Sequence, residues 1–394
     1  MSDVFLLFSR FSHCGAARAS RGRALTLLGK SVIVRCSIQK HIQVIKGTAL
    51  EKLQRWWLGK WDRIAAGPGS SAWLKGIGVL LGLYLLGALV VGLYWSWEPA
   101  RFDVEAKAVP HEGAAPAVGS HTSGALIEIV ETLLNKPGGY LSNDRLPPGI
   151  WLDNVPSWEF GVLVQARDLS RALRKDFSRS QSQSTEDADL AKAEPLLHFN
   201  NKSWLLPSTE GEYRKAVKLM RQYQLRLADP AQTQSQFYAR ADNLSNWLGD
   251  VSTRLGSLSQ RLSASVGQRR LNTDLAGEAD ARQSTQGMAE QDIQTSWLEL
   301  DDVFYEARGT AWALIHILQA VDADFAVALE KKNARVSLEQ IVRELESTQE
   351  TIWSPMVLNG SEFGLVANHS LVMASYISRA NAAIIDLRKL LTQG

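Results

Sequence analysis

The chain has 394 residues, of which 45% are hydrophobic and 21% are charged. This apolar fraction excludes a wholly disordered chain, and a mean hydropathy of −0.13 excludes a protein that crosses a membrane many times. The net charge of +2 conceals an asymmetry. Residues 1–75 carry 13 Lys and Arg against 3 Asp and Glu, whereas residues 76–394 carry 30 against 38. The sequence therefore predicts two compartments of opposite charge joined end to end.

Residues 1–50 form a basic N-terminal extension that is poor in acidic residues. Three interpretations stand side by side: a disordered arm, a transit peptide, and a start codon assigned too far upstream. No aromatic residues alternate with the cations, so we expect no nucleic acid as a partner. The two cysteines of the chain, Cys14 and Cys36, lie here. We therefore expect free thiols in this extension and no disulfide in the rest of the chain.

Residues 51–75 are predicted to be an amphipathic, basic and Trp-rich segment beside a membrane. One helical face of the stretch EKLQRWWLGKWDRI carries Leu53, Trp56, Trp57, Trp61 and Ile64. Four cations surround that face. The pattern is typical of a helix that lies in the lipid interface, with its indoles at the acyl boundary. A cytoplasmic helix docked on a partner is the alternative.

Residues 76–97, GIGVLLGLYLLGALVVGLYWSW, contain no charged residue, and eleven of the 22 are Leu, Ile or Val. A helix of this length measures about 33 Å, against about 30 Å for the hydrocarbon core of a bilayer. No second apolar run of this length follows, so the sequence predicts a single transmembrane helix. Aromatic residues expected in the headgroup regions flank it, namely Trp73, Tyr94, Trp95 and Trp97.

The cations around this segment predict its orientation. Five precede it closely, namely Lys52, Arg55, Lys60, Arg63 and Lys75, whereas Arg101 and Lys107 follow it. Because positive residues stay on the cytoplasmic side, we expect the N-terminus in the cytoplasm and about 300 residues on the far side.

Small residues recur at intervals along the predicted span. Gly78 and Gly82 form a GxxxG motif, and Ala88 and Gly92 repeat the same spacing. Such positions allow two membrane helices to approach closely, so a homo-oligomer is one expected form of partner. The motif is also common by chance in membrane helices.

After the span, the Pro, Ala and Gly content of residues 98–120 predicts a semi-extended tether. Residues 121–394 are predicted to be one helical domain, beginning with a helix at 121–136. The loop after that helix is rich in proline and aromatic residues. We expect it to be packed on the core, because burial favours its apolar side chains, namely Ile150, Trp151, Val155, Trp158 and Phe160.

Three stretches show helical periodicity, with apolar residues spaced alternately three and four apart, at residues 237–262, 297–328 and 373–390. This alternation is typical of coiled-coil-like helices. The second stretch has a broader apolar face, which favours a globular bundle. No strand-type alternation competes, and polar residues 178–189 and 265–292 are the expected long connections. The predicted fold is therefore all-α: one transmembrane helix followed by a bundle of long helices.

No nucleotide-binding loop, hydrolase elbow or metalloprotease motif occurs. We therefore predict no catalytic residue, no metal ligand and no cofactor. His316 lies in the apolar stretch AWALIHILQAV, where a hydrogen-bonded core histidine is favoured over a ligand or base. The best acidic cluster is Glu299, Asp302 and Glu306, which share a helical face. That face could hold a cation, but a solvated surface is favoured over it.

Two stretches resemble a known family. The span ending in YWSWEPARFDV and the segment GGYLSNDRLPPGIWLDNVPSWEFGVLVQARDLSRALR are similar to the bacterial inner-membrane family called domain of unknown function 2333. The resemblance extends from about residue 55 to the C-terminus and leaves residues 1–50 outside. The resemblance implies a Gram-negative envelope protein, so the far side expected from the flanking charges is the periplasm, and it brings no assigned activity and no catalytic residues.

Three functional hypotheses follow from these features. The first is a structural or binding module of the cell envelope, with the lipid bilayer and a second copy or another envelope protein as partners. The second is a sensor whose bundle binds a ligand, although only about 75 residues lie on the cytoplasmic side. The third is an enzyme of unfamiliar type acting on envelope polymers, with the Glu299–Glu306 face or a groove near Trp151 and Trp158 as its site.

Overall fold

The computed structural model describes residue 56 and residues 72–108, 116–180, 184–229, 231–232, 235–271, 290–354, 356–361 and 364–393. The chain divides into two units, residues 1–83 and 84–394. In the first unit, the described residues are Trp56, which is helical and exposed, and the first part of helix α2. The predictions for residues 1–50 and for Trp57 and Trp61 concern residues outside the described part of the chain.

The described residues are largely helical. The α-helices of the first half are α2 (Ala72–Trp95), α3 (Val104–Lys107), α4 (Ser120–Asn135), α5 (Asn154–Ala172) and α6 (Ala188–Leu197). Those of the second half are α7 (Thr209–Ala228), α8 (Ala241–Ser263), α9 (Leu300–Asp324), α10 (Ala326–Lys331), α11 (Arg335–Ser347) and α12 (His369–Thr392). The shorter turns are 3₁₀ at Gly149–Trp151, Ala264–Val266 and Trp297–Glu299, and π at Leu173–Phe177. The predicted all-α class is confirmed.

Helix α2 is long and apolar enough to cross a membrane, judged by its length and composition alone. It begins four residues before the predicted span and ends two residues before the predicted end. The helix ends at Trp95 because Ser96 turns back, with its hydroxyl donating to the Leu93 carbonyl at 2.8 Å, and because Pro99 follows soon after. Most of its apolar side chains are exposed.

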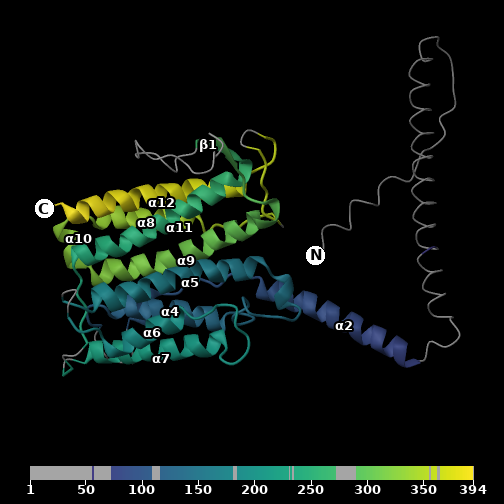
Figure 1. Ribbon diagram of the computed structural model, residues 1–394, viewed down its shortest axis with the longest axis horizontal. Helices are drawn as coiled ribbons and strands as arrows, with labels where there is room; N and C mark the ends of the chain where they lie inside the picture. Colours follow the sequence, from purple (N-terminus) through teal and green to yellow (C-terminus); the bar gives the residue numbers. More distant parts are fainter. Residues whose placement is uncertain are drawn as a thin grey trace, which may run out of the picture. The chain divides into compact units, whose positions relative to one another are not determined.

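The remaining long helices lie side by side in a bundle (Figure 1). Helices α5 and α9 occupy its middle, with α4, α6 and α7 on one side and α8, α11 and α12 on the other. The predicted long connection at residues 265–292 contains a short antiparallel pair at its ends, β1 (Gln268–Leu271) with β2 (Glu290–Ile293). The sequence does not predict this pair, because four residues of ladder require no periodic apolar signal.

The contact between α5 and α9 forms the centre of the core. The two helices run parallel, since Ser157 contacts Asp302 near their N-termini and Phe177 contacts Phe325 beyond their C-termini. They approach closely where two glycines lie. A Cβ added at Gly309 would lie 2.1 Å from the Trp158 carbonyl oxygen, and one added at Gly161 would lie 2.1 Å from that of Glu306. Backbone therefore packs directly against backbone at this crossing.

Helices α8 and α12 form the other long contact. They run antiparallel, because Ser245 and Ser252 of α8 bind Arg388 and Asn381 of α12 respectively. The apolar stripe predicted for α8 is buried, including Leu244, Leu248, Val251, Leu255, Leu258 and Leu262. Coiled-coil geometry for this pair stays a prediction.

The structure differs from the sequence prediction at residues 98–108, which were expected to be part of a tether. This segment is folded onto the bundle instead. Phe102 stacks on the buried His316 ring at a centroid distance of 3.9 Å, and Val104 and Ala108 are buried. Composition alone is misleading here, because one aromatic and a few small apolar residues are enough to pack a short segment on a helix surface. Residues 109–115 lie outside the described part.

We expect Gly309→Ala to reduce the free energy of unfolding by about 1–3 kcal/mol, because the added methyl forces α5 and α9 apart. The matched control is Gly256→Ala on α8, whose added Cβ would meet Asn381 at an ordinary 3.6 Å. The control should be neutral or up to about 1 kcal/mol more stable. Urea unfolding of the full-length protein in detergent micelles, followed by circular dichroism, measures both. Equal stability of the two variants would contradict the close crossing.

Candidate functional site

The most distinctive region of the bundle is the end at which residues 84–98 join it, called here the α2 end. Four segments meet there: the α4–α5 loop (136–153), the α6–α7 loop (198–208), residues 294–299 and the α11–α12 loop (348–368), in so far as they are described. Hydrogen bonds connect the first two loops, from Tyr140 to the Asn201 carbonyl at 3.1 Å and from Asn143 to the Ser203 carbonyl at 2.8 Å. Figure 1 shows this end of the bundle beside the C-terminal part of α2.

The α4–α5 loop runs along the C-terminal half of helix α2. The Tyr84 hydroxyl donates to the Pro147 carbonyl at 3.1 Å, and Pro148 lies so close to Gly92 that a Cβ there would be 3.2 Å from the Pro148 Cβ. Farther along, the Trp95 indole covers Gly138, which has a φ of +85°. A side chain at Gly138 would be both strained and in collision with the indole. The loop and the helix therefore pack over three turns of α2.

A buried ion pair supports the α4–α5 loop from beneath. Lys136 Nζ lies 2.7 Å from Glu159 Oε1, and both side chains are almost fully buried. The Glu159 carboxylate also accepts hydrogen bonds from the backbone N–H groups of Leu141 and Ser142 at 2.8 Å, and Lys136 donates to the Gly139 carbonyl at 2.6 Å. Because each charged atom is hydrogen-bonded, removal of one partner would leave an uncompensated buried charge, at a cost of about 3–5 kcal/mol.

A second ion pair fixes the segment that follows α2. The Arg308 guanidinium of α9 binds both carboxylate oxygens of Glu98 at 2.7 Å. Its remaining N–H groups donate to the Thr348 and Glu350 carbonyls at 3.0 and 2.9 Å. Arg308 is buried, so one side chain holds together the end of α2, the middle of the core and the start of the α11–α12 loop. Bidentate pairs of this kind combine strength with a defined geometry.

Large apolar side chains are exposed at the α2 end. Residues 84–394 contain five exposed tryptophans, and all five lie there, namely Trp97, Trp151, Trp204, Trp297 and Trp353. Exposed aliphatic residues accompany them in the same loops, namely Leu146, Ile150, Leu205, Leu206, Leu298, Met356 and Leu365. The prediction that Ile150, Trp151 and Phe160 are buried is therefore wrong, whereas Trp158 is buried as expected. In the α4–α5 loop Gly149 is buried, whereas Ile150 and Trp151 of the same 3₁₀ turn remain at the surface.

The residues predicted to lie in a lipid interface fall into two groups. Trp56, Trp73, Tyr94 and Trp97 are exposed, and Tyr94 and Trp97 make an edge-to-face contact at 6.1 Å. Trp95 instead packs on Gly138. The small residues of α2 also fall into two groups, those without a neighbour and those that are covered. Among the described residues nothing lies within 4 Å of a Cβ added at Gly78 or Gly82, whereas Gly92 is covered by the α4–α5 loop and Ala88 is buried. The last two positions therefore pack within this chain.

Two cavities lie at the α2 end. The first, of about 260 Å³, is lined by residues that include Trp97, Glu98, Lys136, Trp151, Trp158 and Tyr305. It coincides with the groove that the sequence suggested near Trp151 and Trp158. The second is a more open groove of about 490 Å³ beside the α11–α12 loop, and its lining is mostly apolar, with Phe304, Ile352, Trp353, Met373 and Tyr376 among its residues. Only the second has the size and the apolar lining typical of a ligand site.

The acidic face predicted on α9 is divided between different contacts. Glu306 is paired with Arg261 of α8 at 2.5 and 2.8 Å, and Asp302 accepts a hydrogen bond from the Ser157 hydroxyl at 2.8 Å. Burial raises the pKa of Asp302. Glu299 is exposed at the start of the helix. Within the described residues, no group of three His, Cys, Asp or Glu side chains could hold a metal ion. Asp302 and Glu306 thus connect α9 to its neighbours.

His316 is a core histidine, as the sequence predicts. Its Nδ1 lies 2.7 Å from the Trp312 carbonyl, and its Nε2 accepts the backbone N–H of Phe102 at 3.1 Å. The ring is therefore neutral, with its proton on Nδ1. The pKa of His316 is lowered to about 4, mainly by burial and to a smaller extent by the nearby Arg101 charge, while the bond to the Trp312 carbonyl partly opposes this shift. This histidine stabilises the folded segment 98–108 rather than acting as a ligand.

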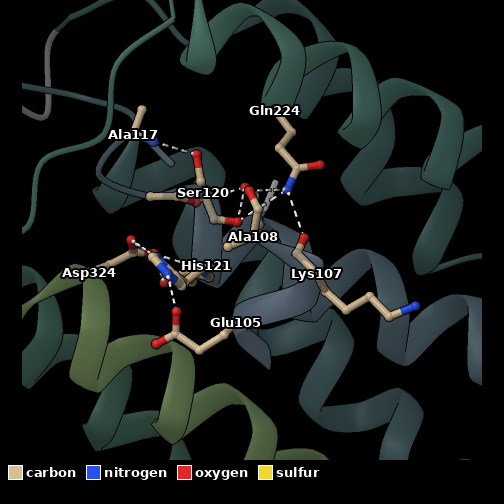
Figure 2. Close-up of polar contacts among 11 residues, drawn as sticks. Glu105, Lys107, Ala108, Ala117, Ser120, His121, Gln224 and Asp324 are labelled. Carbon is tan, nitrogen blue, oxygen red and sulfur yellow. Dashed lines mark hydrogen bonds and ion pairs between the residues drawn. The ribbon is translucent and has the colours of Figure 1, made fainter. Parts of the chain in front are cut away.

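A second polar cluster lies at the opposite end of the bundle, around the first turn of α4 (Figure 2). The buried Asp324 carboxylate accepts the backbone N–H and the hydroxyl of Thr122, each at 2.7 Å, and lies 3.1 Å from His121 Nδ1. On the other side of the ring, Glu105 of α3 lies 3.7 Å from His121 Nε2. The hydrogen bond to Asp324 raises the pKa of His121, and burial opposes it. The cluster fixes the start of α4 to the end of α9.

A family model described as an uncharacterized protein conserved in bacteria (DUF2333) matches residues 69–394. The chain belongs to this family. The match confirms the resemblance seen in the sequence, with a boundary at residue 69 rather than near 55. No curated protein and no solved structure matches the chain.

Sequence reasoning missed the two ion pairs that organise the α2 end of this DUF2333 protein. Glu98 and Arg308 are 210 positions apart, and Lys136 follows α4 whereas Glu159 lies on α5, so no local pattern connects the partners of either pair. The sequence of the α6–α7 loop does indicate an unusual surface. In NKSWLLPS, residues 201–208, three large apolar residues stand between turn-forming polar residues, which is unusual for a surface loop.

The neutral state of His316 predicts a pH dependence for this DUF2333 protein. Because the pKa is 6.5 in the unfolded chain and about 4 in the folded chain, the unfolded chain binds the proton more readily between these values. The free energy of unfolding should decrease as the pH falls from 6.5 towards 4, by up to about 3 kcal/mol from this group.

Urea unfolding of the wild type and of His316→Gln is measured at several pH values between 4 and 6.5. The difference between the two proteins separates the contribution of His316 from that of the carboxylates. The variant should lose the extra dependence on pH, whatever its absolute stability. His121→Asn is the matched control, because the pKa of His121 is raised: its stabilisation is present below pH 6.5 and is lost at higher pH. An unchanged profile for His316→Gln would contradict a buried neutral ring.

Proposed function

We propose that this chain is a single-pass protein of the bacterial inner membrane, with its N-terminus in the cytoplasm and its helical bundle in the periplasm. There the bundle serves as a structural or binding module of the cell envelope, with a second copy or another envelope protein as its partner. The observation that carries the proposal is the direct attachment of the bundle to an apolar helix through Glu98 and Arg308.

The composition of helix α2 supports the membrane assignment. Between Gly76 and Trp97 the chain has no charged residue, and the described apolar side chains of the helix are mostly exposed. Eleven Leu, Ile and Val residues favour insertion by roughly 3–7 kcal/mol in total. Exposure of so many apolar side chains to water would be unfavourable by a similar amount, which favours lipid as the surroundings.

The charges on either side support the orientation. Thirteen Lys and Arg against three Asp and Glu precede Gly76, and the acidic excess lies in the rest of the chain. Translocation favours the segment with fewer cations near the span, so the bundle is the part that crosses. Family members described as conserved in bacteria are consistent with an inner membrane.

The attachment of the bundle supports a structural or binding role. A flexible tether would let a domain reach distant partners, whereas here Glu98 is held three residues after the end of α2. Phe102 and Val104 then continue the contact with the core. The bundle therefore keeps a defined distance from the end of the helix, which suits a module that presents one surface at a fixed height.

Washing membranes with alkaline carbonate should leave the full-length chain in the pellet, and a reporter active only in the periplasm should be active when fused after Gly394. The matched control is a chain with Leu80→Arg and Leu86→Arg. Each Arg near the middle of the helix costs about 2.5–3.5 kcal/mol of insertion, so this chain should appear in the supernatant. Release of the wild type, or activity of a cytoplasmic reporter at Gly394, would overturn the proposal.

A further inference from the structure

The contact between the α4–α5 loop and helix α2 fixes how far the loop reaches along that helix. Tyr84, which binds the Pro147 carbonyl, lies eleven residues before Trp95, which covers Gly138. At 1.5 Å per residue, these positions are about 16 Å apart along the helix axis. Trp95 is expected in the headgroup region. The tip of the loop then lies about three helical turns deeper towards the centre of the bilayer, beside the apolar part of α2.

We propose that the α2 end of the bundle is embedded in the outer leaflet of the same bilayer that α2 crosses, with residues 145–148 inserted beside the helix and the Trp-bearing loops at the lipid interface. This inference rests on the proposed function and specifies its lipid contact. The lipid bilayer is the occupant of the exposed apolar surface, and the bundle stands end-on against the membrane.

The chemistry of the loop tip suits an apolar environment. Pro147 and Pro148 have no backbone N–H group, so two donors that hydrocarbon would leave unpaired do not exist. The Pro147 carbonyl already accepts a hydrogen bond from Tyr84. The side chain of Leu146 is 74% exposed although it lies beside an apolar helix. Arg145 has a long stem, which allows its guanidinium to reach the headgroups.

The neighbouring loops carry the side chains that membrane interfaces favour. The α6–α7 loop presents Trp204 and Leu205, and its Leu206 is fully exposed. On the other side of the same end, Trp297 and Leu298 precede α9, and Trp353 in the α11–α12 loop is 96% exposed. Trp is enriched at the boundary between acyl chains and headgroups because its ring is amphipathic.

The opposite end of the bundle lacks this pattern within the described residues. Its most exposed apolar side chains are single valines, Val118, Val327 and Val336. Scattered aliphatic residues of this kind are normal on soluble surfaces. The other three tryptophans of the bundle, Trp158, Trp247 and Trp312, are buried. The exposed aromatic surface is thus confined to the end from which the apolar helix departs, and this continuity identifies lipid as its occupant.

Charged groups at the α2 end are of both signs: Arg145 and Lys202 are cations, whereas Glu299 and Glu350 are anions. Attraction to anionic headgroups is therefore a minor contribution, and burial of apolar surface is the driving force. The insertion depth should consequently be the same in bilayers of phosphatidylcholine and in mixtures with phosphatidylglycerol. Binding that depended on the anionic lipid would contradict this mechanism.

Spin labels test the inference in the full-length protein. In a background with Cys14→Ser and Cys36→Ser, single cysteines replace Leu146, Leu206 or Trp353 at the α2 end, Val327 or Val336 at the opposite end, and Leu85 in α2. Each labelled protein is reconstituted into vesicles of phosphatidylcholine. Accessibility to oxygen relative to a water-soluble nickel chelate then reports depth. We expect interfacial depth for Leu206→Cys and Trp353→Cys, about 5–10 Å into the headgroup and acyl boundary, and greater depth for Leu146→Cys.

The Val327→Cys and Val336→Cys labels should be fully aqueous, as matched exposed positions. If the labels at the α2 end are aqueous while Leu85→Cys is in hydrocarbon, this inference is wrong and the proposed function stands. If Leu85→Cys is also aqueous, both are wrong. Aqueous labels at Leu206→Cys with spectral broadening between neighbouring labels would identify a second copy as the occupant and equally overturn lipid insertion.

Discussion

The bidentate pairing of Arg308 with Glu98 decides where the bundle lies along the chain. Glu98 follows helix α2 by three residues, and Arg308 lies in the third turn of the central helix α9, so the pairing leaves no length for a flexible connection. Because Arg308 also binds two carbonyls of the α11–α12 loop, the same side chain orders a surface loop of the α2 end. The attachment and the surface are therefore parts of one arrangement.

The two ends of the bundle use polar groups differently. At the α2 end, fully buried and hydrogen-bonded charges hold loops whose outer side chains are apolar, as Glu159 does for the loop that carries Leu146. At the opposite end, the His121 and Asp324 cluster joins the helix termini beneath an ordinary surface. Buried ion pairs contribute little net stability and mainly select one geometry. Two such pairs, Lys136 with Glu159 and Arg308 with Glu98, lie at the α2 end, which is understandable if the shape of that end matters for function.

The helices could be predicted from sequence because their signal is local. The stripe of α8 and the apolar setting of His316 are visible within one or two turns. The packing of residues 98–108 and the exposure of Trp151 could not be predicted in this way. Both depend on partners more than a hundred residues away or on backbone turns, and apolar character alone does not say whether a side chain faces a core or a bilayer. The same ambiguity explains why the loop 201–208 escaped notice.

The central claim is that the bundle is held against the C-terminal half of α2. Cysteines introduced as Gly92→Cys and Pro148→Cys, with Cys14 and Cys36 replaced by Ser, test it in intact cells. The corresponding Cβ positions are 3.2 Å apart, close to the spacing of about 3.5–4.5 Å in disulfides. After mild oxidation we expect an intramolecular disulfide in most of the protein, seen as a mobility shift that a reductant reverses. Free thiols, or bonds only between two chains, would contradict the account.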